Sequence, residues 1–395
     1  MQASKRLDKV PPYLFAEIDR KKAEAIARGV DIINMGIGDP DLPTPKHIVD
    51  ALKAAVDDPS THNYPNYQGE LEYRTAVAAW YKKRFNVTLD PKSEVVALIG
   101  SKEGIAHIFI AFVDPGDVVL VPDPGYPVYQ MGTIMAGGEP YFIPVNESNN
   151  YFPDLSKIPT DIVKRAKILF LNYPNNPTGA VVEKAQMQQA VDFCKAHDIL
   201  LCWDAAYTEN AYDGYHLHSI LEIPGAMDCA IEFHSLSKTY NMTGWRIGMA
   251  SGNAKAVGAL GTIKTNVDSG AFKAIQKAGI VALSSSQESL LVQNKIYQER
   301  RDVLTAGLNS LGWKLKPIKA TFYVWAPVPE GFTSTSFCAQ LLETCGIVAV
   351  PGNGYGPHGE GYFRMAITLP RERIALAVER MRVNKVTFSY KAVPA

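Results

Sequence analysis

The segment 235–246 combines residue types that could bind a phosphate and supply a reactive amine. Ser235, Ser237 and Lys238 lie within four positions of one another, and Arg246 follows eight residues after the lysine. Hydroxyl groups and a guanidinium suit a phosphate, because arginine forms two parallel hydrogen bonds with an oxyanion. A lysine that is shielded from water beside them has its pKa lowered and can act as a nucleophile. Taken alone, Lys238 also fits a solvated side chain, so this interpretation depends on its neighbours.

Three further segments place polar residues directly after apolar runs. Residues 100–104 could bring backbone N–H groups close to an anion at a helix start, although Ser101 also fits an ordinary helix cap. The turn at 172–179 contains two prolines and three asparagines, and these asparagines offer amide donors that a turn alone does not need. Asp204 directly follows another apolar run, and Tyr207 lies three positions after it. A carboxylate at a buried strand end needs a cation or hydrogen-bond donors, unless it caps a helix.

These polar segments are positioned by five uninterrupted apolar runs, which we interpret as strands buried on both faces of a mainly parallel sheet. Helical stretches such as residues 183–197 separate the runs, an alternation typical of an α/β fold. Ligands bind outside the carboxyl ends of the strands in such a sheet, so we expect the polar segments at one edge. The runs cover residues 95–99, 118–121, 168–171, 199–203 and 229–233.

The pattern changes near residue 285. A long amphipathic helix is predicted over 286–311, and an N-terminal helix over 13–28. Strands are expected at 313–325 and 362–368, and helices at 334–345 and 371–383. The sequence therefore predicts a large α/β domain over residues 40–284 and a smaller α+β domain formed by residues 1–39 and 285–395.

The composition of the 395 residues is that of a globular protein, with 47% hydrophobic and 20% charged residues. Forty lysines and arginines balance forty aspartates and glutamates, which argues against a nucleic-acid-binding protein. No signal peptide is visible, and the most apolar run, 104–113, is about half as long as a membrane helix. The five cysteines form no CxxC pair, as expected for reduced thiols. We therefore expect a cytoplasmic enzyme for small molecules that binds neither nucleic acid nor membrane.

The ordered set of motifs resembles the class I/II aminotransferases, which are pyridoxal-phosphate enzymes of fold type I. The resemblance is carried by SLSKTYNMTGWRIG around Lys238, by NYPNNPTG upstream, and by Asp204 and Tyr207 between them. It extends from NMGIGDP at residue 34 to YFRM at residue 362. It implies a seven-stranded, mainly parallel sheet and pyridoxal 5′-phosphate as the cofactor. At finer grain, HNYPNYQG, GSKEGIAH, DPGYPVY and KTNVDSGAF are similar to segments of the LL-diaminopimelate aminotransferases.

The resemblance implies three catalytic residues. Lys238 corresponds to the Schiff-base lysine of the family, whose free amine carries a proton to and from the substrate. Asp204 corresponds to the carboxylate that faces the pyridine nitrogen. Tyr207 and Asn176 correspond to the two donors that face the phenolate oxygen of the ring. Tyr126 corresponds to the aromatic residue that stacks on the ring, although packing also explains a tyrosine there.

The resemblance also implies a phosphate site and a dimer. Tyr64 corresponds to a tyrosine that reaches the phosphate of the neighbouring subunit, which implies an obligatory homodimer with active sites shared across the interface. The remaining phosphate-binding groups are Ser235, Ser237, Arg246 and the backbone N–H groups of Ser101 and Lys102.

The substrate residues follow from the same resemblance. Arg364 corresponds to the arginine that binds the substrate α-carboxylate, a charge-assisted interaction of about 1.5–3 kcal/mol. Gly38, through its backbone, and Asn176 complete this site. Tyr67, Lys102 and the segment 264–273 are expected to meet the distal ammonium and carboxylate of the substrate.

The predicted reaction is a ping-pong transamination, in which one amino acid leaves as an oxo acid before a second oxo acid binds. The resemblance implies LL-2,6-diaminopimelate and 2-oxoglutarate as substrates, and tetrahydrodipicolinate and glutamate as products, in lysine biosynthesis. One alternative is an aminotransferase for alanine, aspartate, methionine or aromatic amino acids. Others are a β-lyase or aminocyclopropane-carboxylate-synthase type of enzyme, and a cofactor-binding regulator, which would need an added DNA-binding region.

Two other constellations are not interpreted as sites. Residues 352–356 are rich in glycine but lack the third glycine and the following helix of a dinucleotide-binding loop, so they predict a turn. His216 and His218 have no cysteine or carboxylate at metal-ligand spacing. We therefore predict a solvated loop there and no metal site.

Overall fold

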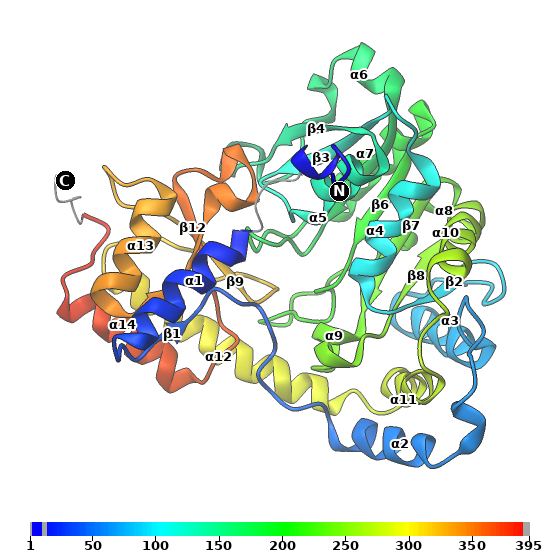
Figure 1. Cartoon of the computed structure of the whole chain (residues 1–395), viewed down its shortest axis with the longest axis horizontal. Coiled ribbons are helices and arrows are strands. Elements are labelled where there is room, and N and C mark those ends of the chain that lie inside the picture. The colour runs from blue at the N-terminus through cyan, green and yellow to red at the C-terminus, as the bar shows by residue number, and fades with distance from the viewer. Residues whose placement is uncertain (1, 10–13, 390–395) are drawn as a thin grey trace.

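The computed structural model describes residues 2–9 and 14–389, and its central feature is a seven-stranded sheet (Figure 1). The strands are β2 (Val95–Leu98), β3 (Val118–Asp123), β4 (Glu139–Pro144), β5 (Ala166–Asn172), β6 (Leu200–Asp204), β7 (Ala230–Ser235) and β8 (Gly248–Gly252). They lie in the order β2-β8-β7-β6-β5-β3-β4. The five strands from β7 to β4 run parallel, whereas β8 is antiparallel to both of its neighbours. The predicted α/β class with a mainly parallel seven-stranded sheet is therefore confirmed.

All five apolar runs form strands, but β4 and β8 were not among the predicted strands. β4 is an edge strand in which Ile143 is the one buried residue, so it shows no continuous apolar run. β8 is fully buried, yet its sequence Gly-Met-Ala-Ser-Gly has little of the β-branched and aromatic character typical of strands.

Helices cover both faces of this sheet (Figure 1). The α-helices are α1 (Leu14–Ala27), α2 (Lys46–Val56), α3 (Leu71–Phe85), α4 (Ser101–Phe112), α5 (Val128–Ala136), α6 (Thr160–Arg165), α7 (Lys184–His197), α8 (Ala226–Cys229), α9 (Leu236–Thr239), α10 (Ala254–Val267), α11 (Lys273–Ser284), α12 (Glu288–Ser310), α13 (Ser334–Cys345) and α14 (Arg371–Val383). Successive side chains of a strand point to opposite faces. Val95 accordingly packs in one hydrophobic cluster with α3, α7 and α11, whereas Val96 packs in another with α4 and α10.

The N-terminal segment and the C-terminal third share a second core. Strands β9 (Tyr323–Pro327), β11 (Val350–Pro351) and β12 (Tyr362–Ala366) form an antiparallel sheet, and β1 (Ile33–Asn34) pairs in parallel with β10 (Ile347–Val348). Ile33 packs in one cluster with residues of α12, α13 and α14. This contact supports a smaller α+β domain, whose boundaries near residues 40 and 285 stay a prediction.

The predicted C-terminal elements need one correction. Residues 313–322 form no strand apart from an isolated bridge at Ala320, and β9 begins only at Tyr323. The predicted helices at 334–345 and 371–383 match α13 and α14, whereas residue 13 of the predicted N-terminal helix lies outside the described residues.

None of the helices in the described part of the chain could cross a lipid bilayer. The long helix α12 extends from the second core toward α11 beneath the large sheet (Figure 1).

Candidate active site

The carboxyl ends of three neighbouring parallel strands carry the polar residues that the sequence singles out. Asn172 ends β5, Asp204 ends β6 and Ser235 ends β7. Asn172 is in register with Asp204, and Asp204 with Phe233 of the next strand. Because parallel strands end at the same edge, the sheet brings these side chains together as predicted.

Asp204 is a buried carboxylate with one strong side-chain partner. Its side chain accepts a hydrogen bond of 2.8 Å from the hydroxyl of Tyr129 and one of 3.3 Å from the backbone N–H of Ala206. Burial raises the pKa of Asp204 to about 6, and these two hydrogen bonds oppose the rise. Tyr129, in the first turn of α5, is absent from the residues predicted by sequence. Its signal would have been its position three residues after Tyr126.

Lys238 lies in the short helix α9 with its amine directed toward the N-terminal segment. Its Nζ donates to the carbonyl oxygen of Gly38 over 3.0 Å. Burial lowers the pKa of Lys238 to about 8; nearby Asp39 opposes this change, and Arg246 and Arg364 add to it. An amine with this pKa is partly neutral near pH 7–8, which is the form that accepts a proton.

The backbone carbonyl of Lys238 is also held in place. It accepts hydrogen bonds from Asn210 Nδ2 at 3.3 Å and from Gln293 Nε2, on α12, at 3.2 Å. Neither amide was predicted from the sequence, because each comes from a segment that shows no motif of its own.

A pair of tyrosines lies beside Gly38. The hydroxyl groups of Tyr207 and Tyr323 are 2.8 Å apart and hydrogen-bonded. A Cβ atom at Gly38 would lie only 2.1 Å from the Tyr323 hydroxyl. Glycine is therefore required at position 38 by the close approach of Tyr323, a residue of β9 that the sequence analysis did not identify.

Arg364 is buried in β12 and joins this site from the second core. Its two terminal nitrogens donate to Asn176 Oδ1 at 2.7 Å and to the Gly36 carbonyl oxygen at 2.6 Å. Its guanidinium carbon lies 4.1 Å from the ring centroid of Tyr323 and 5.1 Å from that of Tyr355. Its Nε is buried without a hydrogen-bond partner. A buried donor without a partner is costly, so this side chain is suited to a bound carboxylate.

A cradle of small residues and N–H groups lies at the start of α4. Gly100 has a φ of +90°, and a Cβ there would lie 2.0 Å from a terminal nitrogen of Arg246. A Cβ at Gly248 would lie 3.2 Å from the backbone nitrogen of Ser101. Ser235 caps the N-terminus of α9, and its hydroxyl oxygen accepts a hydrogen bond of 3.2 Å from the Ser237 N–H. The Arg246 guanidinium and the backbone N–H groups at the start of α4 therefore lie close together, an arrangement that suits an anionic oxygen.

Four of the predicted residues lie at or near the surface. Tyr64 is 79% exposed and Tyr67 is 43% exposed; Lys102 is exposed and Tyr126 half-buried. Tyr126 packs edge-on against Tyr129 with ring centroids 5.9 Å apart. The roles predicted for these residues stay predictions.

The segment 264–273 differs from the predicted loop. Helix α10 continues to Val267 and α11 begins at Lys273. Lys264 is fully buried, and its Nζ lies 2.9 Å from Glu103 Oε2 and 3.0 Å from Asp268 Oδ2. The Lys264 ammonium is thus paired with two carboxylates inside the protein. The contact predicted between the segment 264–273 and the distal end of a substrate stays a prediction.

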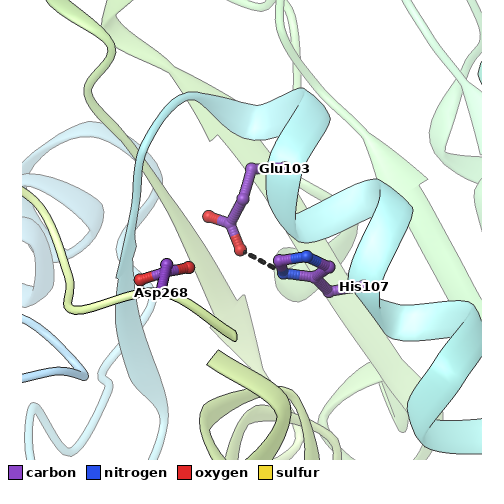
Figure 2. Close-up of side chains that lie close together, drawn as sticks. All are labelled: Glu103, His107 and Asp268. Carbon is purple, nitrogen blue, oxygen red and sulfur yellow. Dashed lines mark hydrogen bonds and ion pairs between the residues drawn. The ribbon is translucent and has the colours of Figure 1, made fainter. Parts of the chain in front are cut away.

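One group of side chains in the described residues has the chemistry of a metal site. Ligand atoms of Glu103, His107 and Asp268 all lie within 4.8 Å of one another (Figure 2). The Lys264 ammonium contacts both carboxylates, so the positive charge between them belongs to the chain itself. His216 and His218 lie outside this group; their ring centroids are 4.9 Å apart, and His218 Nδ1 lies 3.3 Å from Glu222 Oε2.

The glycine-rich residues 352–356 form a short 3-10 helix (Gly352–Tyr355), after which no α-helix opens. The predicted turn is therefore a single short helical turn. It contributes Tyr355 to the surroundings of Arg364.

Comparison with known proteins identifies the family. The model of the family "Aminotransferase class I and II" matches residues 30–381. The chain therefore belongs to the class I and II aminotransferases, and it is an enzyme of that class, as the sequence motifs predicted. Enzymes of this class in general depend on pyridoxal phosphate and act on amino and oxo acids.

Two relatives named LL-diaminopimelate aminotransferase match this chain over nearly its full length. The LL-diaminopimelate aminotransferase of Moorella thermoacetica is 56% identical over 390 residues, covering 98% of this chain and 100% of its own length. The enzyme of the same name from Aquifex aeolicus is 55% identical, covering 97% of this chain and 99% of its own.

Solved structures show the same fold. Substrate-bound BacF from Bacillus subtilis has a TM-score of 0.93 and 38% identity, covering 97% of this chain and 98% of its own. Aspartate aminotransferase from Thermus thermophilus with maleate has a TM-score of 0.90 and 28% identity, covering 97% and 100%.

Proposed function

We propose that this aminotransferase binds pyridoxal 5′-phosphate at the strand edge and transfers an amino group from LL-2,6-diaminopimelate to 2-oxoglutarate, forming tetrahydrodipicolinate and glutamate in lysine biosynthesis. The observation that carries the proposal is the convergence of the Lys238 amine, the Asp204 carboxylate and the Arg364 guanidinium around one site. The substrate follows from relatives named LL-diaminopimelate aminotransferase, which are 51–56% identical to the chain.

The residues present fit this cofactor. The start of α4 and Arg246 suit the phosphate, with Ser235 and Ser237 as further groups, because the Arg246 guanidinium lies directly against Gly100, where a Cβ would come within 2.0 Å of it. Asp204 would hold the pyridine nitrogen, and Tyr207 and Asn176 would face the phenolate oxygen, with Tyr126 on the ring. When bound, the cofactor serves as an electron sink for the carbanion that remains after the α-proton leaves.

Lys238 would transfer a proton during the reaction, whereas Asp204 would keep a proton on the ring nitrogen. The amine of Lys238, with a pKa of about 8, would take the α-proton and return it, because a base is most effective when its pKa is near the working pH. The Gly38 carbonyl oxygen holds that amine at 3.0 Å. The Asp204 carboxylate, with a pKa of about 6, is ionised at pH 7 and would hold a proton on the ring nitrogen.

Arg364 would bind the substrate α-carboxylate and so orient the α-carbon toward Lys238. Its Nε is the buried donor without a partner, and its other two nitrogens are fixed by Asn176 and Gly36. A side chain that is fixed before the ligand arrives loses little entropy on binding. The Gly38 backbone completes this part of the proposed site.

We also propose that the protein is a homodimer. Tyr64 is a large aromatic residue with 79% of its surface exposed, which fits a side chain that is covered by a second copy of the chain and reaches its phosphate site. Tyr67 and Lys102 would meet the distal end of the substrate. If Tyr67→Phe and Lys102→Ala leave kcat/KM for diaminopimelate unchanged, that assignment of the distal pocket is wrong.

The absorption spectrum of the purified protein tests the cofactor and the donor together. With pyridoxal phosphate added, the wild-type protein should show the visible band of the lysine-bound cofactor, and Lys238→Ala should not. Lys255, an exposed lysine on α10, provides the matched control as Lys255→Ala. A normal band and full activity in Lys238→Ala would contradict the proposed function.

Single amino acids, added without an acceptor, then identify the donor. LL-diaminopimelate and glutamate should bleach the band, whereas alanine, aspartate and phenylalanine should not. Bleaching by another donor would retain the transamination and reject the proposed substrate. Release of pyruvate or ammonia without an acceptor would indicate a β-lyase.

A further inference from the structure

The buried ammonium of Lys264 connects two segments that the proposed function uses separately. It forms ion pairs with Glu103 at the start of α4 and with Asp268 at the end of α10. The Lys264 side chain is fully buried, and the two carboxylates are largely buried. A buried charge is costly unless it is paired and hydrogen-bonded, so these three groups must stay together in the folded protein.

On one side, Glu103 fixes the turn before α4. Its Oε2 accepts a hydrogen bond of 3.1 Å from the backbone N–H of Ile99 in addition to the Lys264 ion pair, and its Oε1 lies 2.7 Å from His107 Nδ1. The Glu103 side chain thus reaches back over the residues that join β2 to α4, namely Gly100 and the first two residues of the helix, Ser101 and Lys102. That turn carries the backbone N–H groups proposed to bind the phosphate.

On the other side, Asp268 fixes a turn that packs against the loop of Tyr67. Asp268 Oδ1 accepts a hydrogen bond of 2.7 Å from the Gly270 N–H, while Oδ2 contacts Lys264. Gly270 has a φ of +82°, and a Cβ there would lie 3.1 Å from the Asn66 carbonyl oxygen and 3.3 Å from Tyr67 Cα. The position of the turn therefore limits where the backbone of Tyr67 can lie.

We propose that Lys264 is a positioning residue that ties the phosphate-binding turn before α4 to the loop carrying Tyr67, and that its ammonium occupies the place a metal ion would take between Glu103 and Asp268. Figure 2 shows Glu103 and His107 of α4 beside Asp268, which follows α10, and the Lys264 ammonium contacts both carboxylates. Without the ammonium, two carboxylates would face each other and repel. This inference rests on the proposed function.

The test compares Lys264→Met, which keeps the length and apolar stem of the side chain, with Lys255→Met on the exposed face of the same helix. The apoproteins are titrated with pyridoxal phosphate and with pyridoxal, which lacks the phosphate. Lys264→Met should weaken binding of pyridoxal phosphate by roughly 10–150-fold, the value expected if the displaced segment loses one hydrogen bond to the phosphate. Binding of pyridoxal should stay unchanged. Lys255→Met should change neither. Equal weakening of both ligands, or no weakening, would overturn the proposal.

Amide hydrogen exchange on the apoprotein gives a readout that needs no activity. The N–H groups of Ile99 and Gly270 should exchange faster in Lys264→Met than in the wild type. The N–H of Val145, which donates to the Asp123 carbonyl oxygen at 2.8 Å, should keep its rate because it belongs to neither of the two segments that Lys264 connects. Loss of protection at Val145 as well would mean general loosening and would contradict a positioning role.

Two milder variants keep the proposal testable if Lys264→Met does not fold. Glu103→Gln should weaken the binding of pyridoxal phosphate. Asp268→Asn should raise KM for diaminopimelate and leave the affinity for pyridoxal phosphate unchanged. The reverse pattern would overturn the assignment of the two sides. If the wild-type protein shows no cofactor band, the proposed function fails; if it shows the band and Lys264→Met binds pyridoxal phosphate normally, only this inference fails.

Discussion

Replacement of Tyr129 by phenylalanine is expected to raise the pKa of Asp204. The Tyr129 hydroxyl donates to Asp204 Oδ2 over 2.8 Å, and burial has already raised this pKa to about 6. A hydrogen bond to a charged group contributes about 1.5–3 kcal/mol, and one pH unit corresponds to about 1.4 kcal/mol. Loss of the hydroxyl should therefore raise the pKa by about 1–2 pH units, to roughly 7–8.

The assay has a part on the apoprotein and a part on the enzyme. The folded pKa of Asp204 lies above its ordinary value of 3.8, so the stability it contributes is fully present below pH 3.8 and is lost as the pH rises through about 6. In Tyr129→Phe this loss should extend to higher pH in apoprotein unfolding experiments. The acid limb of the pH profile of kcat should also move to higher pH, because a protonated Asp204 cannot stabilise a positive ring nitrogen.

Tyr81→Phe is the matched control, since the Tyr81 hydroxyl donates to the buried carboxylate of Glu232 over 2.8 Å. It removes the same group from a different buried carboxylate and should leave the acid limb in place. If the acid limb of Tyr129→Phe coincides with that of the wild type, the Tyr129 hydroxyl does not control Asp204, and the reasoning from this contact is refuted.

Three other substitutions test separate contacts. Gly38→Ala places a Cβ 2.1 Å from the Tyr323 hydroxyl and should lower kcat/KM by roughly 100-fold through misplacement of groups at the site; a wild-type value in steady-state kinetics would show that Tyr323 moves freely. Arg364→Lys loses the two hydrogen bonds to Asn176 and Gly36 and should raise KM for every amino acid by roughly 10–100-fold, whereas an unchanged KM would remove Arg364 from the carboxylate site. Burial raises the pKa of Glu232 to about 7 from 4.5, so its stabilisation is present below pH 4.5 and lost as the pH rises through about 7; Glu232→Gln should flatten this part of the stability curve, and an unaltered curve would assign the pH dependence to other groups.

The sequence predicted the part of the site that depends on local patterns. Asp204 and Ser235 end continuous apolar runs, and such runs identify buried parallel strands whose carboxyl ends share one edge. The positions of Lys238 and Arg246 follow from the same strand end. Arg364 could be identified only through the family resemblance, because it enters the site from a different sheet.

The missed residues reach the site from elements without a local signal. Gln293 comes from the second turn of α12 and donates to the Lys238 carbonyl oxygen, whereas Tyr323 comes from β9 and lies against Gly38, which accepts from the Lys238 amine. Only the tertiary packing brings these segments together. Lys264 illustrates the opposite error. A lysine among polar residues suggests an exposed loop, but Lys264 is a helical residue whose charge is compensated by Glu103 and Asp268. Glu103 is distant in the chain, and Asp268 lies one helical turn away.

The close approach of Tyr323 to Gly38 has a consequence for how the two positions can diverge over evolution. A Cβ at position 38 would meet the ring carbons of Tyr323 at 2.4 and 2.5 Å as well as the hydroxyl, so removal of the hydroxyl alone would not make room. A side chain can enter at position 38 only where residue 323 is smaller than an aromatic ring. Positions 38 and 323 should therefore covary across homologous chains, although nearly 300 residues separate them in the sequence.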